Sequence, residues 1–279
     1  MLNTKLVFIL INYFNENEVS DFVAYQLGID LIKRNVDVVI VDNGSNNNMV
    51  FEQLKNTYPD IMILNPKKNS GYFGGANIGL KEYLKEYGMP AAVVVSNVDI
   101  EFVGTDFIDK LKSRVSENNF EVLGPDITST FLGQKQNPYM KQRISESKIK
   151  IISAFSSNVL LYNMFLFFHF VKTKLKSFIQ KAKQNESAEQ SVIYGIHGSF
   201  MVFHNNYFNK GGVLEYPSFL FGEEIFVGEQ CRKNGMKTVF EPSLKILHHE
   251  HSSTGIFKNK ANAGFIHQSY QYLLKHYND

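Results

Sequence analysis

The stretch Ala91-Ala-Val-Val-Val-Ser-Asn-Val-Asp99 decides the fold of this chain. It is short and almost entirely apolar, it follows Pro90, and it ends in the polar residues Asn97 and Asp99. Such a run is typical of a buried central β-strand. Ligands of open α/β sheets bind just beyond the carboxyl ends of these strands, and a carboxylate there suits a divalent cation that carries phosphate groups. The stretch therefore predicts both where a site lies and which chemistry it supports.

Strands and helices alternate along the chain on both sides of this stretch. Apolar runs predict strands at Lys5–Ile11, Val36–Val41, Ile61–Leu64, Ala91–Ser96 and Val122–Asp126. Helical spacing predicts helices over Glu16–Lys33, Val50–Thr57 and Thr105–Glu117, and from a glycine-rich loop to Tyr87. Residues 191–246 return to a pattern of strand, turn, helix and strand. The alternation predicts an α/β fold with a mostly parallel central sheet flanked by helices.

Composition excludes several classes of protein. The 279 residues are 44% hydrophobic, which suffices for a sizeable core, and the formal net charge of +2 makes no case for a nucleic-acid partner. A single cysteine, Cys231, excludes disulfide scaffolds and multi-cysteine zinc sites and favours a reducing compartment. The apolar N-terminus is interpreted as the first strand and not as a signal peptide. No apolar run reaches the roughly 18 residues that cross a bilayer.

Four polar clusters follow predicted strands, and in a doubly wound sheet they would face one crevice. They are Asn12-Tyr13, Asp42-Asn43-Gly44-Ser45, the loop Asn69-Ser-Gly-Tyr-Phe-Gly-Gly-Ala-Asn77, and Asn97-Val-Asp99. The loop is neither a Walker loop nor a dinucleotide fingerprint, because it lacks both spacings. It still lets backbone approach a ligand closely, with a helix N-terminus behind it. A plain helix cap is the alternative for the loop, and a simple turn is the alternative for any other cluster taken alone.

Two further clusters lie later in the chain. Glu223 and Glu224 begin a predicted helix, where acidic residues either complement the helix dipole or provide a general base beside a site. The run His248-His-Glu-His251 fits no zinc motif, so we expect one histidine to assist a metal that is held mainly elsewhere.

These residues together resemble family 2 of the inverting glycosyltransferases, which includes bacterial rhamnosyl-, galactosyl- and glucosyltransferases of surface-polysaccharide assembly. Val-Asp42-Asn-Gly-Ser is similar to the family's Val-Asp-Asn-x-Ser, and the Asn69–Gly79 loop is similar to its glycine-rich Asn-x-Gly segment. Asn97-Val-Asp99 resembles its Asn-Pro-Asp form of the Asp-x-Asp motif. The likeness covers about residues 5–103 and 191–254. It implies the GT-A fold, a nucleotide-diphosphosugar transferase architecture.

The resemblance also implies a role for each matching residue. Asp99 would bind Mg²⁺ or Mn²⁺ with help from His248, and Gly198 and Ser199 would lie on the acceptor side. Glu224 would be the catalytic base, with Glu223 as the reserve, because Glu-Glu stands where the family usually has Glu-Asp. The predicted nucleotide-sugar-binding residues are Asn12, Tyr13, Asp42, Asn43, Asn69, Gly71, Gly75, Asn77 and Asn97.

The predicted organisation is a single domain over residues 1–279. Residues 1–103 would bind the nucleotide sugar, 104–254 would form the acceptor-binding and catalytic half, and 255–279 would be a C-terminal helical tail. The predicted function is inverting transfer of a sugar from a nucleotide-diphosphate donor to a saccharide or lipid-linked saccharide acceptor in polysaccharide biosynthesis. The alternatives are a catalytically degenerate carbohydrate- or nucleotide-binding protein on the same fold, and a sugar nucleotidyltransferase.

A basic and aromatic helical insert over about residues 135–185 fits the family least. Five basic residues precede its apolar stretch Ile151–Val171 and five lysines follow it. Residues 151–183 would either lie on a membrane interface, where aromatic residues and cations cooperate, or pack within the chain or in a homodimer. The expected location is the cytoplasm, with the inner face of the cytoplasmic membrane as the site of a lipid-linked acceptor. No nucleic-acid partner is expected.

Overall fold

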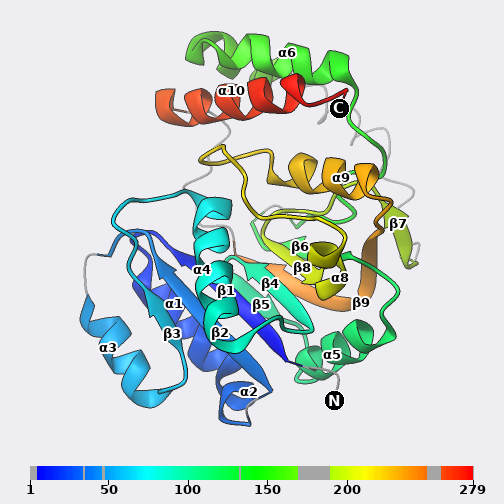
Figure 1. Ribbon diagram of the computed structural model, residues 1–279. Coiled ribbons are helices and arrows are strands. Elements are labelled where there is room, and N and C mark those ends of the chain that lie inside the picture. The colour runs from blue at the N-terminus through cyan, green and yellow to red at the C-terminus, as the bar shows by residue number, and fades with distance from the viewer. Residues whose placement is uncertain are drawn as a thin grey trace.

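A nine-stranded sheet forms the centre of the molecule in the computed structural model (Figure 1), which describes residues 5–33, 35–45, 48–131, 133–168, 189–249 and 259–278. The strand order is β3-β2-β1-β4-β8-β6-β9-β5, and β7 pairs with β9. The strands are β1 (Leu6–Asn12), β2 (Val36–Asp42), β3 (Met62–Leu64), β4 (Ala92–Ser96), β5 (Ile100–Phe102), β6 (Val122–Ser129), β7 (Ser191–Ile193), β8 (Phe200–His204) and β9 (Thr238–His248).

The first four strands in the order are parallel, so their carboxyl ends meet at one edge. The register pairs Asn12 of β1 with Asp42 of β2, and Leu10 with Ser96 of β4. β8 joins β4 in the antiparallel direction, and β6 and β9 then run parallel to each other. The predicted mostly parallel α/β sheet is confirmed. The five predicted strands up to Asp126 differ from β1, β2, β3, β4 and β6 by three residues at most, whereas β5 was not predicted and β9 runs without a turn from Thr238 to His248.

Helices cover both faces of the sheet, because residues of each buried strand point alternately to the two sides. The helices are α1 (Glu16–Phe22), the π-helical turn η1 (Val23–Leu27), α2 (Gly28–Ile32), α3 (Asn48–Thr57), α4 (Tyr72–Tyr87), α5 (Phe107–Glu117), α6 (Glu146–Ser156), α8 (Asn205–Asn209), α9 (Glu223–Lys233) and α10 (Lys260–Lys275). Phe8 of β1 belongs to the core with α1, α3 and α5, whereas Ile9 belongs to the core with α4 and α9. No helix among the described residues is long and apolar enough to cross a membrane.

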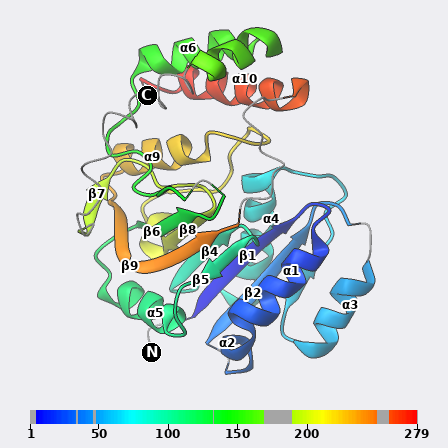
Figure 2. The ribbon, with the colours of Figure 1, turned by 180° about the vertical axis from the view of Figure 1, so that it is seen from behind.

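The insert and the C-terminal tail pack on each other, which the sequence did not indicate. Figures 1 and 2 show α6 and α10 side by side at one end of the molecule, beyond α9. His267 of α10 bonds through Nδ1 to the carbonyl oxygen of Ser153 of α6 at 2.8 Å, and Gln271 donates to the Ser153 hydroxyl at 2.9 Å. Residues 159–168 are also helical. The predicted insert is therefore helical only over 146–156 and 159–168. Residues 135–145 form no helix and make isolated bridges through Lys135 and Met140, and residues 169–185 lie outside the described part of the chain.

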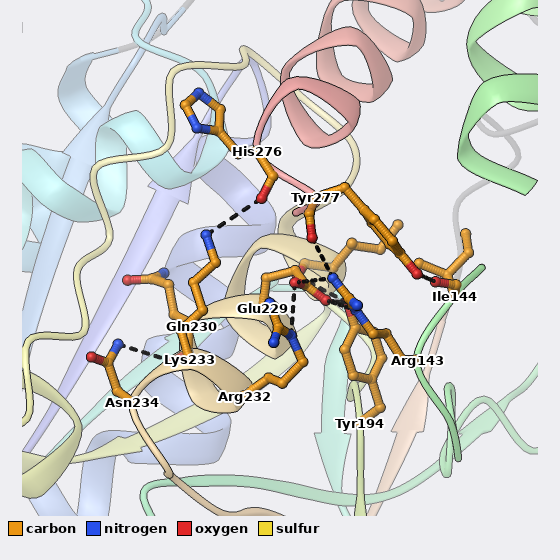
Figure 3. A network of polar contacts seen from close by, with 11 residues as sticks. Arg143, Ile144, Tyr194, Glu229, Gln230, Arg232, Lys233, Asn234, His276 and Tyr277 are labelled. Atoms are coloured by element: carbon orange, nitrogen blue, oxygen red, sulfur yellow. Dashed lines mark hydrogen bonds and ion pairs between the residues drawn. The ribbon is translucent and has the colours of Figure 1, made fainter. Parts of the chain in front are cut away.

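A polar network joins this layer to α9 (Figure 3). Arg143, at the start of the insert, donates to both carboxylate oxygens of Glu229 at 2.7 and 2.8 Å and to the Tyr277 carbonyl oxygen at 2.5 Å. Tyr194 and Arg232 also donate to Glu229, at 2.8 and 3.0 Å. Burial would raise the pKa of Glu229, but these donors outweigh it and lower the pKa. A bidentate ion pair of this kind stabilises the contact and also fixes its geometry. The insert, α9 and the C-terminal tail are therefore joined into one unit.

Candidate active site

Asn12 and Asp42 come together at the carboxyl ends of the two paired strands β1 and β2. Asn12 Nδ2 donates to Asp42 Oδ1 at 2.8 Å and to the Gly44 carbonyl oxygen at 3.0 Å. The Gly44 N–H and the Ser45 hydroxyl also donate to the Asp42 carboxylate. Both Asn12 and Asp42 are buried. These three donors fix the direction of the Asp42 carboxylate.

Two aromatic rings stand next to this pair. The rings of Tyr13 and Phe14 lie 4.6 Å apart, and each keeps about half of its surface exposed, at 58% and 51%. Phe14 has a φ of 56°, a left-handed conformation that is uncommon for a bulky residue. Its backbone N–H donates to the Gly44 carbonyl oxygen at 2.8 Å, which holds this conformation. An exposed aromatic surface is thus fixed beside Asp42.

The glycine-rich loop is held against two other segments. Asn69 Oδ1 accepts from the Gly71 N–H at 2.9 Å, and Asn43 Nδ2 donates to the Gly71 carbonyl oxygen at 3.0 Å. Gly71 has a φ of 76°, and a Cβ there would lie 2.0 Å from the Phe219 carbonyl oxygen. Only glycine fits this position. The loop therefore links Asn43 to the segment that leads into α9.

Gly75 and Asn77 lie further along the same segment, within α4. A Cβ at Gly75 would lie 3.1 Å from the side chain of Ile11 and 3.2 Å from Nδ2 of Asn43. A Cβ at Gly79, one turn later, would lie 2.8 Å from Ile9. These glycines let α4 pack closely on the sheet. The structure thus indicates that Gly75 allows close packing of α4 on the sheet, in addition to the binding role predicted for it.

Asp99 and His248 meet at the end of the central strand. Nε2 of His248 lies 3.3 Å from Oδ1 of Asp99, and Oδ1 is buried and accepts no hydrogen bond. Nδ1 of His248 lies 2.8 Å from Oε1 of Gln136, so Nδ1 carries the proton in the neutral imidazole. A lone pair on Nε2 then faces an orphaned carboxylate oxygen, which is unfavourable unless a proton or a cation lies between them.

This pair fits a divalent cation. Neighbouring ligands of an octahedral Mg²⁺ or Mn²⁺ lie about 3 Å apart when each bond is about 2.1 Å, and the two side-chain atoms of Asp99 and His248 are separated by 3.3 Å. Within the described residues, no group of three or more acidic, histidine or cysteine side chains could hold a metal. A cation bound here would thus need ligands from a diphosphate or water as well. Glu250 and His251 of the histidine-rich run, and Ser253 and Thr254 after it, lie outside the described residues.

The turn His197-Gly198-Ser199 connects this edge to the predicted base. The Asn97 N–H donates to the Ser199 carbonyl oxygen at 2.8 Å, and the Gly198 N–H donates to Glu224 Oε1 at 3.3 Å. A Cβ at Gly198 would lie 3.0 Å from that same carboxylate oxygen. Nδ1 of His197 accepts from the Ser199 N–H at 3.2 Å, and burial, reinforced by His248, lowers the pKa of His197 to about 4. His197 is therefore neutral at physiological pH.

Glu223 and Glu224 begin α9 directly after two residues in left-handed conformations. Phe221 has a φ of 72° and Gly222 a φ of 87°. Strain of this kind persists where the surroundings hold it, often at functional sites. Glu223 is buried and its Oε1 has no hydrogen-bond partner, whereas Glu224 retains some exposed surface and accepts from Gly198.

Both glutamates have raised pKa values. Burial, reinforced by the charge of Glu224, raises the pKa of Glu223 to about 8, while burial alone raises the pKa of Glu224. The two carboxyl groups are coupled, so their protons leave in steps that belong to the pair. A carboxylate whose pKa approaches neutrality is a better proton acceptor than an ordinary glutamate. The helix N-terminus thus carries a candidate base with a suitable proton affinity.

Tyr72 lies between the two halves of this arrangement. Its hydroxyl donates to the Gly198 carbonyl oxygen at 3.1 Å. Burial raises the pKa of Tyr72 well above its usual range, with further contributions from Glu223, Asp99 and Glu224. The charges of the predicted metal ligand and of both predicted bases therefore all raise the pKa of this one hydroxyl group, so the three carboxylates lie in one region of the molecule.

Several side chains at this site were not predicted from the sequence. Ser269 of α10 donates to the Phe221 carbonyl oxygen at 2.6 Å and lies 2.6 Å from the Tyr216 hydroxyl. The charge of Glu224 is the leading cause that raises the pKa of Tyr139. Burial, reinforced by the charge of Glu224, raises the pKa of Tyr270 on α10. Tyr139 belongs to the insert and Tyr270 to the tail, where no motif marks them. Of these side chains, only Tyr72 belongs to a sequence motif, the glycine-rich loop.

Comparison with known proteins first defines the class of fold. A solved structure of GalNAc-T7 with UDP, GalNAc and Mn²⁺ matches 90% of this chain with a TM-score of 0.56 and 13% sequence identity. The match covers 44% of that longer chain. That structure is a GT-A glycosyltransferase, so the predicted GT-A fold is confirmed.

Two curated proteins that are similar to this chain in sequence are more specific than the fold. The N-acetylglucosaminyl-diphospho-decaprenol L-rhamnosyltransferase of Mycobacterium tuberculosis is 24% identical over 234 residues, which cover 80% of this chain and 69% of the relative. The low-salt glycan biosynthesis hexosyltransferase Agl10 of Haloferax volcanii is 24% identical over 231 residues, which cover 83% of this chain and 62% of the relative. No model of a known protein family matches the chain. The predicted resemblance to rhamnosyl- and hexosyltransferases is confirmed.

Proposed function

We propose that this protein is an inverting glycosyltransferase that moves a sugar from a nucleotide diphosphate to a saccharide acceptor. The observation that carries the proposal is the position of Glu224, a carboxylate with a raised pKa that bonds to Gly198, on the same turn that joins the Asp99 segment through Ser199 and Asn97. An acceptor base and a diphosphate-binding pair thus share one edge of a GT-A sheet. The glycosyltransferase relatives support the same conclusion.

The nucleotide would lie along the carboxyl ends of β1 and β2. Asp42, held by Asn12, would accept hydrogen bonds from the ribose or base, and the exposed rings of Tyr13 and Phe14 would pack against the nucleoside. The glycine-rich loop after Asn69 would let backbone approach the diphosphate closely, with the N-terminus of α4 behind it. Asn43, Gly71 and Asn97 would hold the backbone of this binding edge in place through their hydrogen bonds.

Asp99 and His248 would hold Mg²⁺ or Mn²⁺ between them, since an unsatisfied carboxylate oxygen and an imidazole nitrogen face each other there. When bound, such a cation offsets the charge that the leaving diphosphate gains. Gln136 would fix the tautomer of His248 through its bond to Nδ1, as partners of metal-binding histidines commonly do.

Glu224 would remove the proton from the acceptor hydroxyl while that oxygen attacks the anomeric carbon. The bond from this carbon to the diphosphate breaks in the same step, so the configuration inverts and no covalent enzyme intermediate forms. The Gly198 N–H would hold the carboxylate in direction, and the raised pKa gives it the affinity for a proton that this step needs. Glu223 is buried behind it and would raise the proton affinity of the pair.

The acceptor would be a lipid-linked saccharide, and the protein would then work in the cytoplasm at the inner face of the cytoplasmic membrane. The mycobacterial relative is named for a decaprenol-linked acceptor. Tyr139 and Tyr270, whose pKa values the charge of Glu224 helps to raise, would form the acceptor side with Gly198 and Ser199. Aromatic side chains suit the apolar faces of sugar rings.

Turnover by matched glutamine variants tests the assignment of the base. In Glu224→Gln, we expect kcat for sugar transfer to fall by about 10²–10⁴-fold, with the dissociation constant of the nucleoside diphosphate unchanged. Glu223→Gln, one residue away, is the matched control and should lose much less. Unchanged turnover in Glu224→Gln would contradict the assignment. Donor binding without turnover in the wild-type protein, over a broad acceptor panel, would favour the catalytically degenerate binding protein.

A further inference from the structure

We propose that the outer face of the insert, formed by α6 and residues 159–168, is a docking surface for an anionic lipid membrane. The biological purpose of this surface rests on the proposed function, because a lipid-linked acceptor lies in a membrane. The experiment that tests membrane binding does not depend on the proposed function. The face is defined by seven exposed side chains. They are Ile151, Phe155, Leu160, Leu161, Met164, Phe167 and Phe168.

Exposed large apolar side chains are more concentrated here than in any other part of the described sequence. Each is between 39% and 67% exposed, and all seven fall within 18 consecutive residues that include no aspartate, glutamate, lysine or arginine. The opposite face of the same helices is buried through Ile149, Ile152 and Tyr162. A helix pair that is apolar on its outer face as well as its inner one lacks the polar surface that water requires.

The charge of the segment identifies an anionic partner. Residues 135–185 contain ten basic residues and one acidic residue, Glu146, so their formal charge is +9 and the remainder of the chain carries −7. Among the described residues, Lys141, Lys148 and Lys150 are exposed. Lys148 and Lys150 belong to α6 itself, and Lys150 pairs with Glu146 at 2.7 Å. Aromatic and aliphatic side chains beside cations are what an interfacial helix uses on a bilayer with anionic lipids.

The same charge disfavours a second copy of this chain as the partner. A two-fold dimer brings one patch onto the identical patch of its partner. The exposed lysines of α6, Lys148 and Lys150, would then face their own copies, which opposes association at ordinary ionic strength. A membrane surface instead offers negative charge to the lysines and hydrocarbon to the phenylalanines.

The position of the face suits delivery of a membrane-held acceptor. α6 contacts α10 through Ser153, and α10 contacts the strained turn before Glu223 through Ser269. One helix thus separates the proposed docking face from the proposed catalytic turn, and Figures 1 and 2 show this order of α6, α10 and α9. Docking through α6 would hold α10 and the acceptor side next to the bilayer.

Vesicle flotation of the full-length protein tests the proposal. The vesicles would be phosphatidylcholine alone or phosphatidylcholine with phosphatidylglycerol. We expect the wild-type protein to float with the anionic vesicles, less so at high salt. The double variant Leu160→Asp/Phe168→Asp should bind at least about tenfold more weakly, because it puts charge at the two most exposed side chains of the apolar face.

The matched control changes two equally exposed apolar residues at the opposite end of the molecule, in Ile29→Asp/Ile32→Asp on α2. This control should float like the wild-type protein, and both double variants should keep the wild-type melting temperature. Failure of the wild-type protein to bind anionic vesicles would overturn the proposal. So would equal weakening in the two variants, or a wild-type dimer that Leu160→Asp/Phe168→Asp dissociates.

Sugar transfer to a soluble saccharide acceptor separates this proposal from the proposed function. Transfer that persists without vesicle binding overturns the docking surface and leaves the enzyme assignment standing. Vesicle binding without transfer to any acceptor supports the docking surface and counts against the enzyme assignment.

Discussion

Glu223 and Glu224 are neighbours on one helical turn, yet their side chains have different surroundings. Glu223 is buried and its Oε1 has no hydrogen-bond partner, and burial raises its pKa more than its backbone hydrogen bonds lower it. Glu224 has the Gly198 N–H as a donor and keeps some exposed surface. The family resemblance favoured Glu224 and kept Glu223 as the reserve, because Glu-Glu replaces the usual Glu-Asp. Burial and one backbone donor favour Glu224 as the base.

The raised pKa values predict how activity and stability depend on pH. Because the proposed base must be ionised, kcat should rise with pH through an apparent pKa above the usual range of glutamate. Stability should change in the opposite direction. The pKa of Glu223 is about 8 in the folded protein against an ordinary 4.5, so its contribution is complete below about pH 4.5 and is lost as the pH rises through 8.

Thermal unfolding of the wild-type protein and of Glu223→Gln across this pH range measures the effect. We expect the difference in melting temperature to shift in favour of the variant as the pH rises, since glutamine cannot ionise. A difference that stays constant from acid to alkaline pH would show that Glu223 titrates normally. The kcat profile of the same variant reports whether the apparent pKa of the base falls once its buried neighbour is neutral.

At the scale of elements, strands were easier to predict than the contacts of the later helices. The runs around Phe8, Ile40 and Val94 are buried on both faces, and this continuous apolar character marks them in the sequence. Their carboxyl ends therefore predicted that Asn12, Asp42 and Asp99 would lie along one edge. The packing of α10 on α6 depends on a Ser153 carbonyl oxygen and on side chains more than 100 residues away, for which a single sequence has no signal.

Ser269 tests whether α10 takes part in positioning the catalytic turn. In Ser269→Ala, two bonds to the Phe221–Tyr216 segment are lost. We expect a loss of about 1–2 kcal/mol of stability and a fall of roughly tenfold in kcat, with nucleoside diphosphate affinity unchanged. The readouts are thermal unfolding, steady-state kinetics and calorimetric titration.

Ser116→Ala is a suitable control, because Ser116 is an exposed helical serine on α5 that bonds only to its own helix at Lys112. Equal kcat in Ser269→Ala and the wild-type protein would limit α10 to a structural role. Restored activity in Ser269→Thr, which keeps the hydroxyl group, would support positioning by hydrogen bonding.

At the scale of the whole molecule, one sheet brings together segments that are far apart in the chain. Asp99 follows β4, His248 ends β9 and Glu224 begins α9, and the turn at Gly198 is bonded to two of these three segments. The motif resemblance predicted the GT-A fold and the glycosyltransferase likeness, and both are confirmed by the comparisons. The roles of the site residues and the division into halves at residue 103 stay predictions. The insert could not be placed from motifs, because it has none.

The melting temperature of the full-length protein with a panel of nucleoside diphosphates and nucleotide sugars, each with and without Mn²⁺, tests the central claim most directly. A ligand that binds only the folded protein stabilises it by about 2.7 kcal/mol at 100 times its dissociation constant. We predict a rise in melting temperature with at least one nucleoside diphosphate and its sugar, larger with Mn²⁺ and reduced by Asp99→Asn. No rise with any of these ligands, in either metal condition, would contradict a nucleotide-sugar site at this edge of the sheet.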